Sequence, residues 1–127
     1  MSDENNLWNP LEFESVTTPK AILSEQASYL TKMTKNVLRA RIRAGTNPKN
    51  LVFNFEIIAP SLNNYVLVVC SVSHDLVKWY PLTLVSHPSG EIIKCEDEAE
   101  FINKLKEELN RKDVIEAIKS LFAQSRS

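Results

Sequence analysis

LVFNFEIIAPSLNNYVLVVCSVSHDLVKWYPLTLV, residues 51–85, is the stretch that decides the fold. Its only formal charges are Glu56, Asp75 and Lys78, and it is rich in β-branched and aromatic residues, which favour strands. Turn-forming polar residues interrupt it at 60–64 and again at 73–75. The stretch therefore predicts three consecutive antiparallel strands, over about 51–59, 65–73 and 78–85.

Side chains alternate between the two faces of a strand, so the first of these strands has one apolar face. Leu51, Phe53, Phe55 and Ile57 share that face, which we expect to be buried. The run from Tyr65 to Val72 is apolar on both faces, which is typical of a central strand covered on both sides by helices or by a second subunit. Pro81 has no amide hydrogen to donate, so the third strand is expected at an edge or with a bulge.

The segment before this stretch predicts a helix followed by a fourth strand. Thr17-Thr18-Pro19 is a helix start, because a threonine oxygen can cap the first turn and proline is favoured at the first helical position. Apolar residues then recur every three or four positions, at Leu23, Ala27, Leu30, Met33 and Val37. Residues 37–44 fit either a longer helix or a strand. We prefer the strand, because a continued helix would place Arg41 within its apolar face.

The C-terminal third predicts two more helices, over about 96–109 and 113–123, with Asp113 as a cap of the second. Ile92 and Ile93 either form a short extra strand or pack beneath a loop. The predicted fold class is therefore α+β: an N-terminal helix, a four-stranded antiparallel sheet (about 37–44, 51–59, 65–73 and 78–85) and two C-terminal helices. Residues 18–127 form one domain, preceded by an acidic arm, residues 1–17.

Composition narrows the classes of function. The chain has 127 residues, 43% hydrophobic and 24% charged, and its net charge of −1 gives no overall attraction to nucleic acid or to an acidic membrane. No signal peptide is expected, so the predicted location is cytoplasmic and reducing, and no segment is long enough to cross a membrane. With only Gly45 and Gly90, the chain cannot build a glycine-rich phosphate loop, and we expect no cofactor.

Candidate catalytic groups are few. Ser73-His74-Asp75 is expected to be a turn, because adjacent residues of an extended chain point to opposite sides and cannot form a triad. His74 and His87 flank one strand, too far apart for a shared metal, so no metal site is predicted. Cys70 lies in the most apolar strand, where burial suppresses the thiolate. A small enzyme using Cys95 or His74 is retained as the last of three hypotheses.

One region is strongly basic. Lys32, Lys35, Arg39, Arg41 and Arg43 occur without an intervening acid, and on a strand the three arginines would share one face, roughly 7 Å apart. Such a row is a candidate binding patch for nucleic-acid phosphates. The competing interpretation is that the arginines pair with Glu56, with the acidic arm or with the acidic helix start at 96–100.

The arm contains Asp3, Glu4, Glu12 and Glu14 and no base, yet it also carries apolar residues that a free tail would not need. Trp8, Leu11 and Phe13 either pack on the domain's own surface or are anchors that dock on a partner. The sequence thus predicts a small non-catalytic protein that acts by protein–protein binding, with a homodimer as one form. Nucleic-acid binding through residues 32–43 is the alternative.

Overall fold

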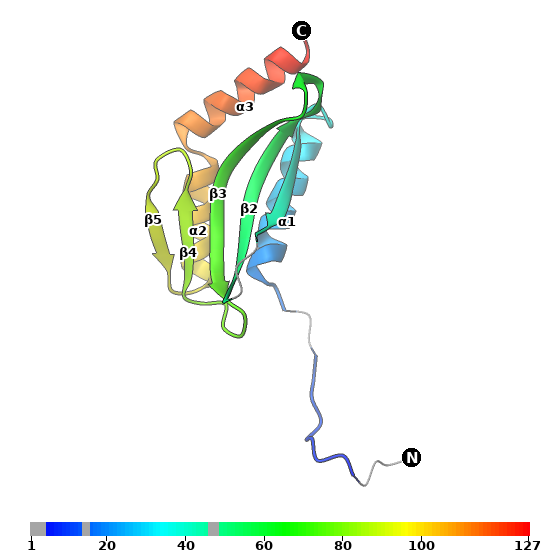
Figure 1. Ribbon diagram of the computed structural model, residues 1–127, viewed down its shortest axis with the longest axis vertical. Helices are drawn as coiled ribbons and strands as arrows, with labels where there is room; N and C mark the ends of the chain where they lie inside the picture. The colour runs from blue at the N-terminus through cyan, green and yellow to red at the C-terminus, as the bar shows by residue number, and fades with distance from the viewer. Residues whose placement is uncertain (1–4, 14–15, 46–48) are drawn as a thin grey trace.

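The computed structural model describes residues 5–13, 16–45 and 49–127. Within these ranges the chain forms three α-helices, five strands and one short 3₁₀ turn, in agreement with the predicted α+β class (Figure 1). In chain order the elements are α1 (Pro19–Met33), β1 (Arg39–Ala44), β2 (Asn50–Ala59), η1 (Pro60–Leu62), β3 (Tyr65–Asp75), β4 (Leu82–Ser86), β5 (Ile92–Cys95), α2 (Glu98–Leu109) and α3 (Lys112–Ser125).

The strands form one antiparallel sheet in the order β1-β2-β3-β4-β5, so each strand pairs with its neighbour in sequence. The apolar strand β3 lies at the centre, as its composition predicts. Its register with β2 shifts between Phe55 and Glu56, where Val69 has no partner of its own on β2. Because a bulge increases local twist, this shift accompanies the bend of β3 in Figure 1.

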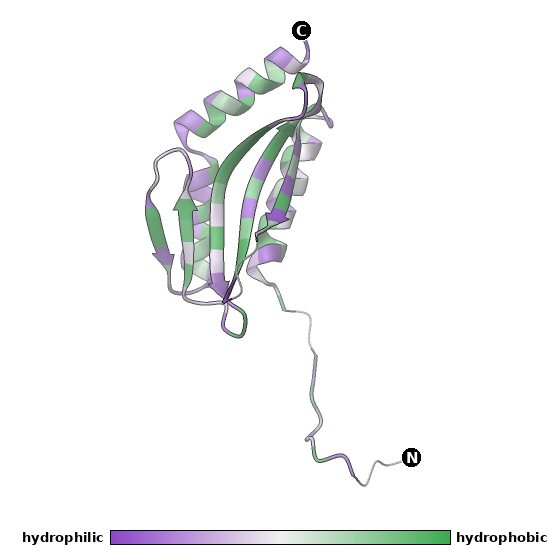
Figure 2. Ribbon diagram, in the orientation of Figure 1, coloured by the Kyte–Doolittle hydropathy of each residue, from purple (hydrophilic) through white to green (hydrophobic). Residues whose placement is uncertain are grey.

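The helices cover one face of the sheet. In Figure 1, α1 and α2 lie behind the strands and run in the same direction, and α3 crosses near the far ends of β2 and β3. Phe55, Ile57, Leu23, Phe101 and Val114 belong to one buried cluster that joins β2 to all three helices. Figure 2 shows apolar residues concentrated along the strands and both kinds of residue along each helix. The sheet's other face carries no helix of the described residues.

Three predictions about the sheet need correction. Ser73, His74 and Asp75 are not a turn but the last residues of β3, because β2 begins early enough to pair with all three. The sheet has five strands, because Ile92–Cys95 pairs with β4 rather than only packing beneath a loop. The predicted strand 78–85 begins only at Leu82, and Lys78 to Pro81 lie in the preceding loop, with a cis peptide bond between Tyr80 and Pro81. The absence of an amide hydrogen on Pro81 is the physical reason that the ladder starts after it.

The helix starts follow the capping rules. Thr18 accepts a hydrogen bond from the Ala21 amide (3.1 Å) and Pro19 is the first helical residue, while Asp97 accepts from the Glu100 amide (2.9 Å). Asp113, however, is not the cap of α3. The helix begins one residue earlier at Lys112, and Asp113 lies in its first turn, where its carboxylate accepts hydrogen bonds from Val114 and from Arg111.

The junction between α1 and β1 explains why residues 37–44 are a strand. Thr34 ends the helix, and its Oγ1 accepts the Leu38 amide (3.2 Å). One turn earlier, Thr31 Oγ1 accepts the Ala40 amide (3.0 Å), a group on the free edge of the sheet. Two threonine hydroxyls therefore stop the helix and protect part of the β1 edge from pairing with another chain.

Candidate functional site

The N-terminal arm, in its described residues 5–13 and 16–17, does not lie on the domain. It leaves the start of α1 and extends away from the sheet and the helices (Figure 1). The exposed fractions of its apolar side chains are 93% for Leu7, 77% for Trp8, 58% for Leu11, 89% for Phe13 and 62% for Val16. The interpretation in which Trp8 and Phe13 pack on their own domain is therefore not what the structure shows. Asp3, Glu4 and Glu14, part of the predicted acidic character, lie outside the described residues.

A groove separates α1 from α2 on the side of the helices that faces away from the sheet's core. Its wider part, of about 520 Å³, begins at Thr17 and runs between Ile22 on α1 and Ile102, Leu105 and Leu109 on α2. Ile22 and Leu105 are almost fully buried, whereas Ile102 is 46% exposed on the rim. The wall also includes polar and charged side chains, those of Glu25, Gln26, Glu98, Lys106 and Asn110, and the last residue of the arm lies at its mouth.

A narrower hollow of about 180 Å³ continues this groove between the second half of α1 and α3. Leu109 and Asn110 line both parts, so the two are contiguous. Phe55 and Ile57 of β2 also line the narrower hollow, and Tyr29 and Met33, which are 50% and 73% exposed, stand at its rim. We call the two parts together the helix-face groove. Phe55 and Ile57, at the base of the narrower part, are only 2% and 1% exposed.

The predicted basic residues are divided between two parts of the fold. Arg39, Arg41 and Arg43 alternate outward along β1, as predicted, on the face of the sheet that bears no described helix. Lys32 is instead in the last turn of α1, and Lys35 is in the turn that follows it. The structure thus brings together the three arginines and leaves the two lysines on the helical side.

We call the uncovered face of the sheet the open sheet face. Cross-strand partners share a face in an antiparallel sheet, so the register defines its members. They are Arg39, Arg41, Arg43, Asn50, Val52, Asn54, Glu56, Ile58, Val66, Val68, Ser71, Ser73, Asp75, Thr83, Val85, Ile92 and Lys94. This face therefore carries four basic groups and two acids, Glu56 and Asp75, although the whole chain has a net charge of −1.

Only one of the three arginines has the pairing that the competing interpretation expects. Arg41 Nε lies 2.9 Å from Glu56 Oε1, and Glu56 is only 3% exposed although it lies on the open sheet face. Among the described residues, Arg39 and Arg43 form no ion pair, and both are exposed. Arg41 therefore neutralises a buried carboxylate, and Arg39 and Arg43 are the two arginines with free charge.

A polar chain next to this row was not predicted from the sequence. Ser71 Oγ lies 2.6 Å from Asn54 Oδ1 and 2.8 Å from His87 Nε2. With the serine proton donated to Asn54, the serine oxygen is the acceptor and His87 Nε2 is the donor. This is the reverse of the arrangement in which a histidine base activates a serine nucleophile. These hydrogen bonds therefore link β2, β3 and the β4–β5 turn.

The residues of the enzyme hypothesis are placed away from solvent. Cys70 and Cys95 are both fully buried. Burial, with a smaller effect of Glu108, raises the pKa of Cys70 to about 12, and burial with the nearby Glu100 raises that of Cys95 to about 11. His74 is 5% exposed, its Nδ1 lies 2.8 Å from the Asp75 carbonyl oxygen, and its ring lies against Phe53. All three side chains are therefore buried.

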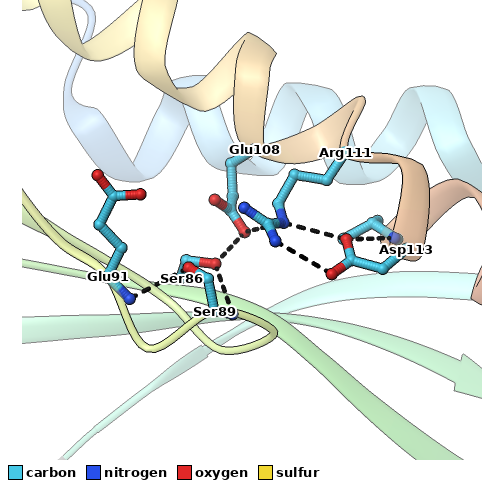
Figure 3. A network of polar contacts seen from close by, with 7 residues as sticks. Ser86, Ser89, Glu91, Glu108, Arg111 and Asp113 are labelled. Atoms are coloured by element: carbon cyan, nitrogen blue, oxygen red, sulfur yellow. Dashed lines mark hydrogen bonds and ion pairs between the residues drawn. The ribbon is translucent and has the colours of Figure 1, made fainter.

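The most extensive polar network ties the β4–β5 turn to the corner between α2 and α3 (Figure 3). Ser86 Oγ donates to Glu108 Oε2 (2.7 Å), and Arg111 Nε lies 4.0 Å from the same oxygen. Arg111 also donates two hydrogen bonds to Asp113, at 3.0 and 3.1 Å, which lowers the pKa of that carboxyl. These contacts fix the first turn of α3, which forms one wall of the helix-face groove.

Glu108 is a buried acidic residue of α2. It is 3% exposed and receives the Ser86 hydroxyl. Helical periodicity alone does not predict this burial. Glu108 has the same spacing as Phe101 and Leu105, but a charged residue is not expected on the buried stripe of a helix. Ser86, at the end of a strand, is the partner that makes the burial tolerable.

The part of the chain that the structure describes contains no group of three His, Cys, Asp or Glu side chains that could hold a metal ion. Within the same ranges, no helix has both the length and the apolar character that a membrane crossing requires. Comparisons with protein-family models, with curated proteins and with solved structures found no match to this chain.

Proposed function

We propose that this protein is a non-catalytic protein-binding module, and that its first partner is another copy of itself. The observation that carries the proposal is the arm. Leu7, Trp8, Phe13 and two further apolar residues are 58–93% exposed, and leaving such side chains in water forgoes the free energy of their burial. Aromatic anchors of this kind dominate the energetics of protein interfaces.

The rest of the molecule supports binding rather than chemistry. The buried thiols have raised pKa values, and His74 is held by the backbone of Asp75. Ser71, whose Oγ lies 2.8 Å from His87 Nε2, donates its proton to Asn54. The helix-face groove, in contrast, combines apolar side chains with a few polar ones, as surfaces that receive protein side chains do.

Sedimentation velocity of the full chain over a range of concentrations tests this function. The expected result is an increase of the sedimentation coefficient with concentration, which the W8S/F13S variant shifts to higher concentration. The matched control is V77S, because Val77 is 95% exposed in the β3–β4 loop, outside the arm and the groove. A chain that stays monomeric at every concentration, or a control variant as defective as W8S/F13S, would overturn the proposal.

Nucleic-acid binding is a second candidate, supported by Arg39 and Arg43. Both are exposed on an uncovered face and have no ion pair among the described residues. Binding through phosphates weakens linearly in the logarithm of salt concentration. Fluorescence anisotropy with single-stranded RNA and duplex DNA should then show a salt slope that R39A/R43A reduces by about two phosphate contacts. Absence of binding at low salt would exclude this candidate.

A further inference from the structure

We infer that the helix-face groove is the receptor for the N-terminal arm of a second copy, so that two copies exchange arms reciprocally. This inference rests on the proposed self-association and identifies the surfaces through which two copies bind each other. The arm and the groove are both apolar features of the described chain that lack a covering element, and they begin at the same place, because Thr17 both ends the arm and lines the groove.

The arm is long enough to span the groove. An extended chain advances about 3.3 Å per residue, so residues 7–16 reach about 30 Å. The groove follows α1, whose 15 residues span about 22 Å at 1.5 Å per residue. An arm laid along it from Thr17 therefore carries Val16 and Phe13 into the wider part, beside Ile102 and Leu105, and Leu11 toward the narrower hollow above Phe55.

The direction of the arm favours a second copy over the arm's own groove. Proline restricts the residue before it to extended backbone, and Thr18 has φ −84° and ψ 159°. The chain thus enters α1 from outside, and the arm extends away from its own domain (Figure 1). Occupying its own groove would require a reversal immediately before the cap, whereas a neighbouring copy receives the arm without one.

Reciprocal exchange also closes the assembly. When copy one places its arm in copy two and copy two does the same, both arms and both grooves are filled in one symmetric dimer, and no apolar surface of this kind remains to recruit a third copy. Pairing through the β1 edge is a less suitable route to a dimer, because Thr31 Oγ1 already accepts the outward Ala40 amide.

Site-specific crosslinking between two differently substituted copies tests the inference. Phe13→Cys is placed in one preparation of the full chain and Ile102→Cys in another, and the mixture is treated with a short bis-maleimide. Cys70 and Cys95 give little background, because both are fully buried. The expected result is a crosslinked dimer that contains one copy of each variant.

The matched control replaces Ile102→Cys by Ile58→Cys, the same substitution on the open sheet face opposite Arg39. Crosslinking of Phe13→Cys to position 58 rather than 102 would overturn the inference while leaving self-association intact, and would place the acidic arm on the basic row. Raised salt distinguishes the same two surfaces. In about 1 M NaCl, contacts between exposed charges are screened and crosslinking to the basic row should be lost, whereas an apolar contact in the groove should persist.

Two further outcomes are decisive. A chain carrying both Phe13→Cys and Ile102→Cys that forms an internal crosslink at the mass of a monomer would show that the arm returns to its own groove. A monomeric wild-type chain at all concentrations would instead remove the proposed function itself. The two failures are therefore distinguished by the mass of the crosslinked product and by sedimentation without a crosslinker.

Discussion

Replacing Phe13 with serine is the most informative single change, because its effect on self-association can be worked out from exposure. Phe13 is 89% exposed in the described conformation, so nearly all of its side chain remains to be buried at an interface. Burying a phenylalanine side chain contributes about 1.5–3 kcal/mol. A symmetric exchange buries two copies, so F13S should cost about 3–6 kcal/mol, which is about a 10²- to 10⁴-fold increase in the dimer Kd.

Sedimentation equilibrium at several loading concentrations measures the Kd of the wild type and of F13S. The V77S variant is the control, since Val77 is 95% exposed and the exchange leaves it so. Circular dichroism should show that F13S retains the wild-type fold, because Phe13 makes no contact with the core cluster. A Kd for F13S within a factor of about three of the wild-type value would refute the reasoning, since the expected loss is at least about tenfold per arm.

Three more predictions concern the domain itself. R41A removes the partner of the buried Glu56 carboxylate and should lower the free energy of unfolding by about 1–3 kcal/mol in urea denaturation. R43A, at an exposed arginine without an ion pair among the described residues, should change the free energy of unfolding by less than about 0.5 kcal/mol. Equal effects of the two substitutions would contradict the pairing of Arg41 with Glu56. Cys70 and Cys95 should resist thiol reagents at pH 8 in the folded protein, because pKa values of about 12 and about 11 leave thiolate fractions on the order of 10⁻⁴ and 10⁻³; labelling as fast as a free cysteine would be inconsistent with their burial. The same thiols ionise at lower pH in the unfolded chain, so the free energy of unfolding should fall as the pH rises from about 8.5 toward these values. T34V should cost about 1–3 kcal/mol, because the Leu38 amide loses its acceptor, and an unchanged denaturation midpoint would argue against that role of Thr34.

Much of the fold could be predicted because local patterns and tertiary packing agree. The alternation of Arg39, Arg41 and Arg43 with smaller residues identified β1, and Thr18-Pro19 identified the start of α1. The boundaries were less predictable where a single hydrogen bond decides them. Thr34 ends α1 through contacts with Leu38 that no periodicity contains, and the fifth strand forms because four residues find a partner in β4.

The candidate site was predictable only in part. Trp8, Leu11 and Phe13 stood out because apolar residues are unexpected in an acidic arm. The groove did not, because it depends on how far apart α1 and α2 lie, and an apolar stripe such as Ile102 and Leu109 has the same spacing whether it faces a neighbouring helix or an opening. Arg41 and Arg43 also look alike in the sequence, and only the register shows which one faces Glu56.

The exchange of arms is tested most directly by isotope-filtered nuclear Overhauser spectroscopy on a mixed dimer of ¹³C-labelled and unlabelled full chains. Arm exchange predicts contacts between the methyl groups of Ile102 and Leu109 in the labelled copy and the aromatic protons of Phe13 in the unlabelled copy. Contacts from those aromatic protons to Ile58 or Val66 on the open sheet face, or no contacts between copies at all, would contradict it.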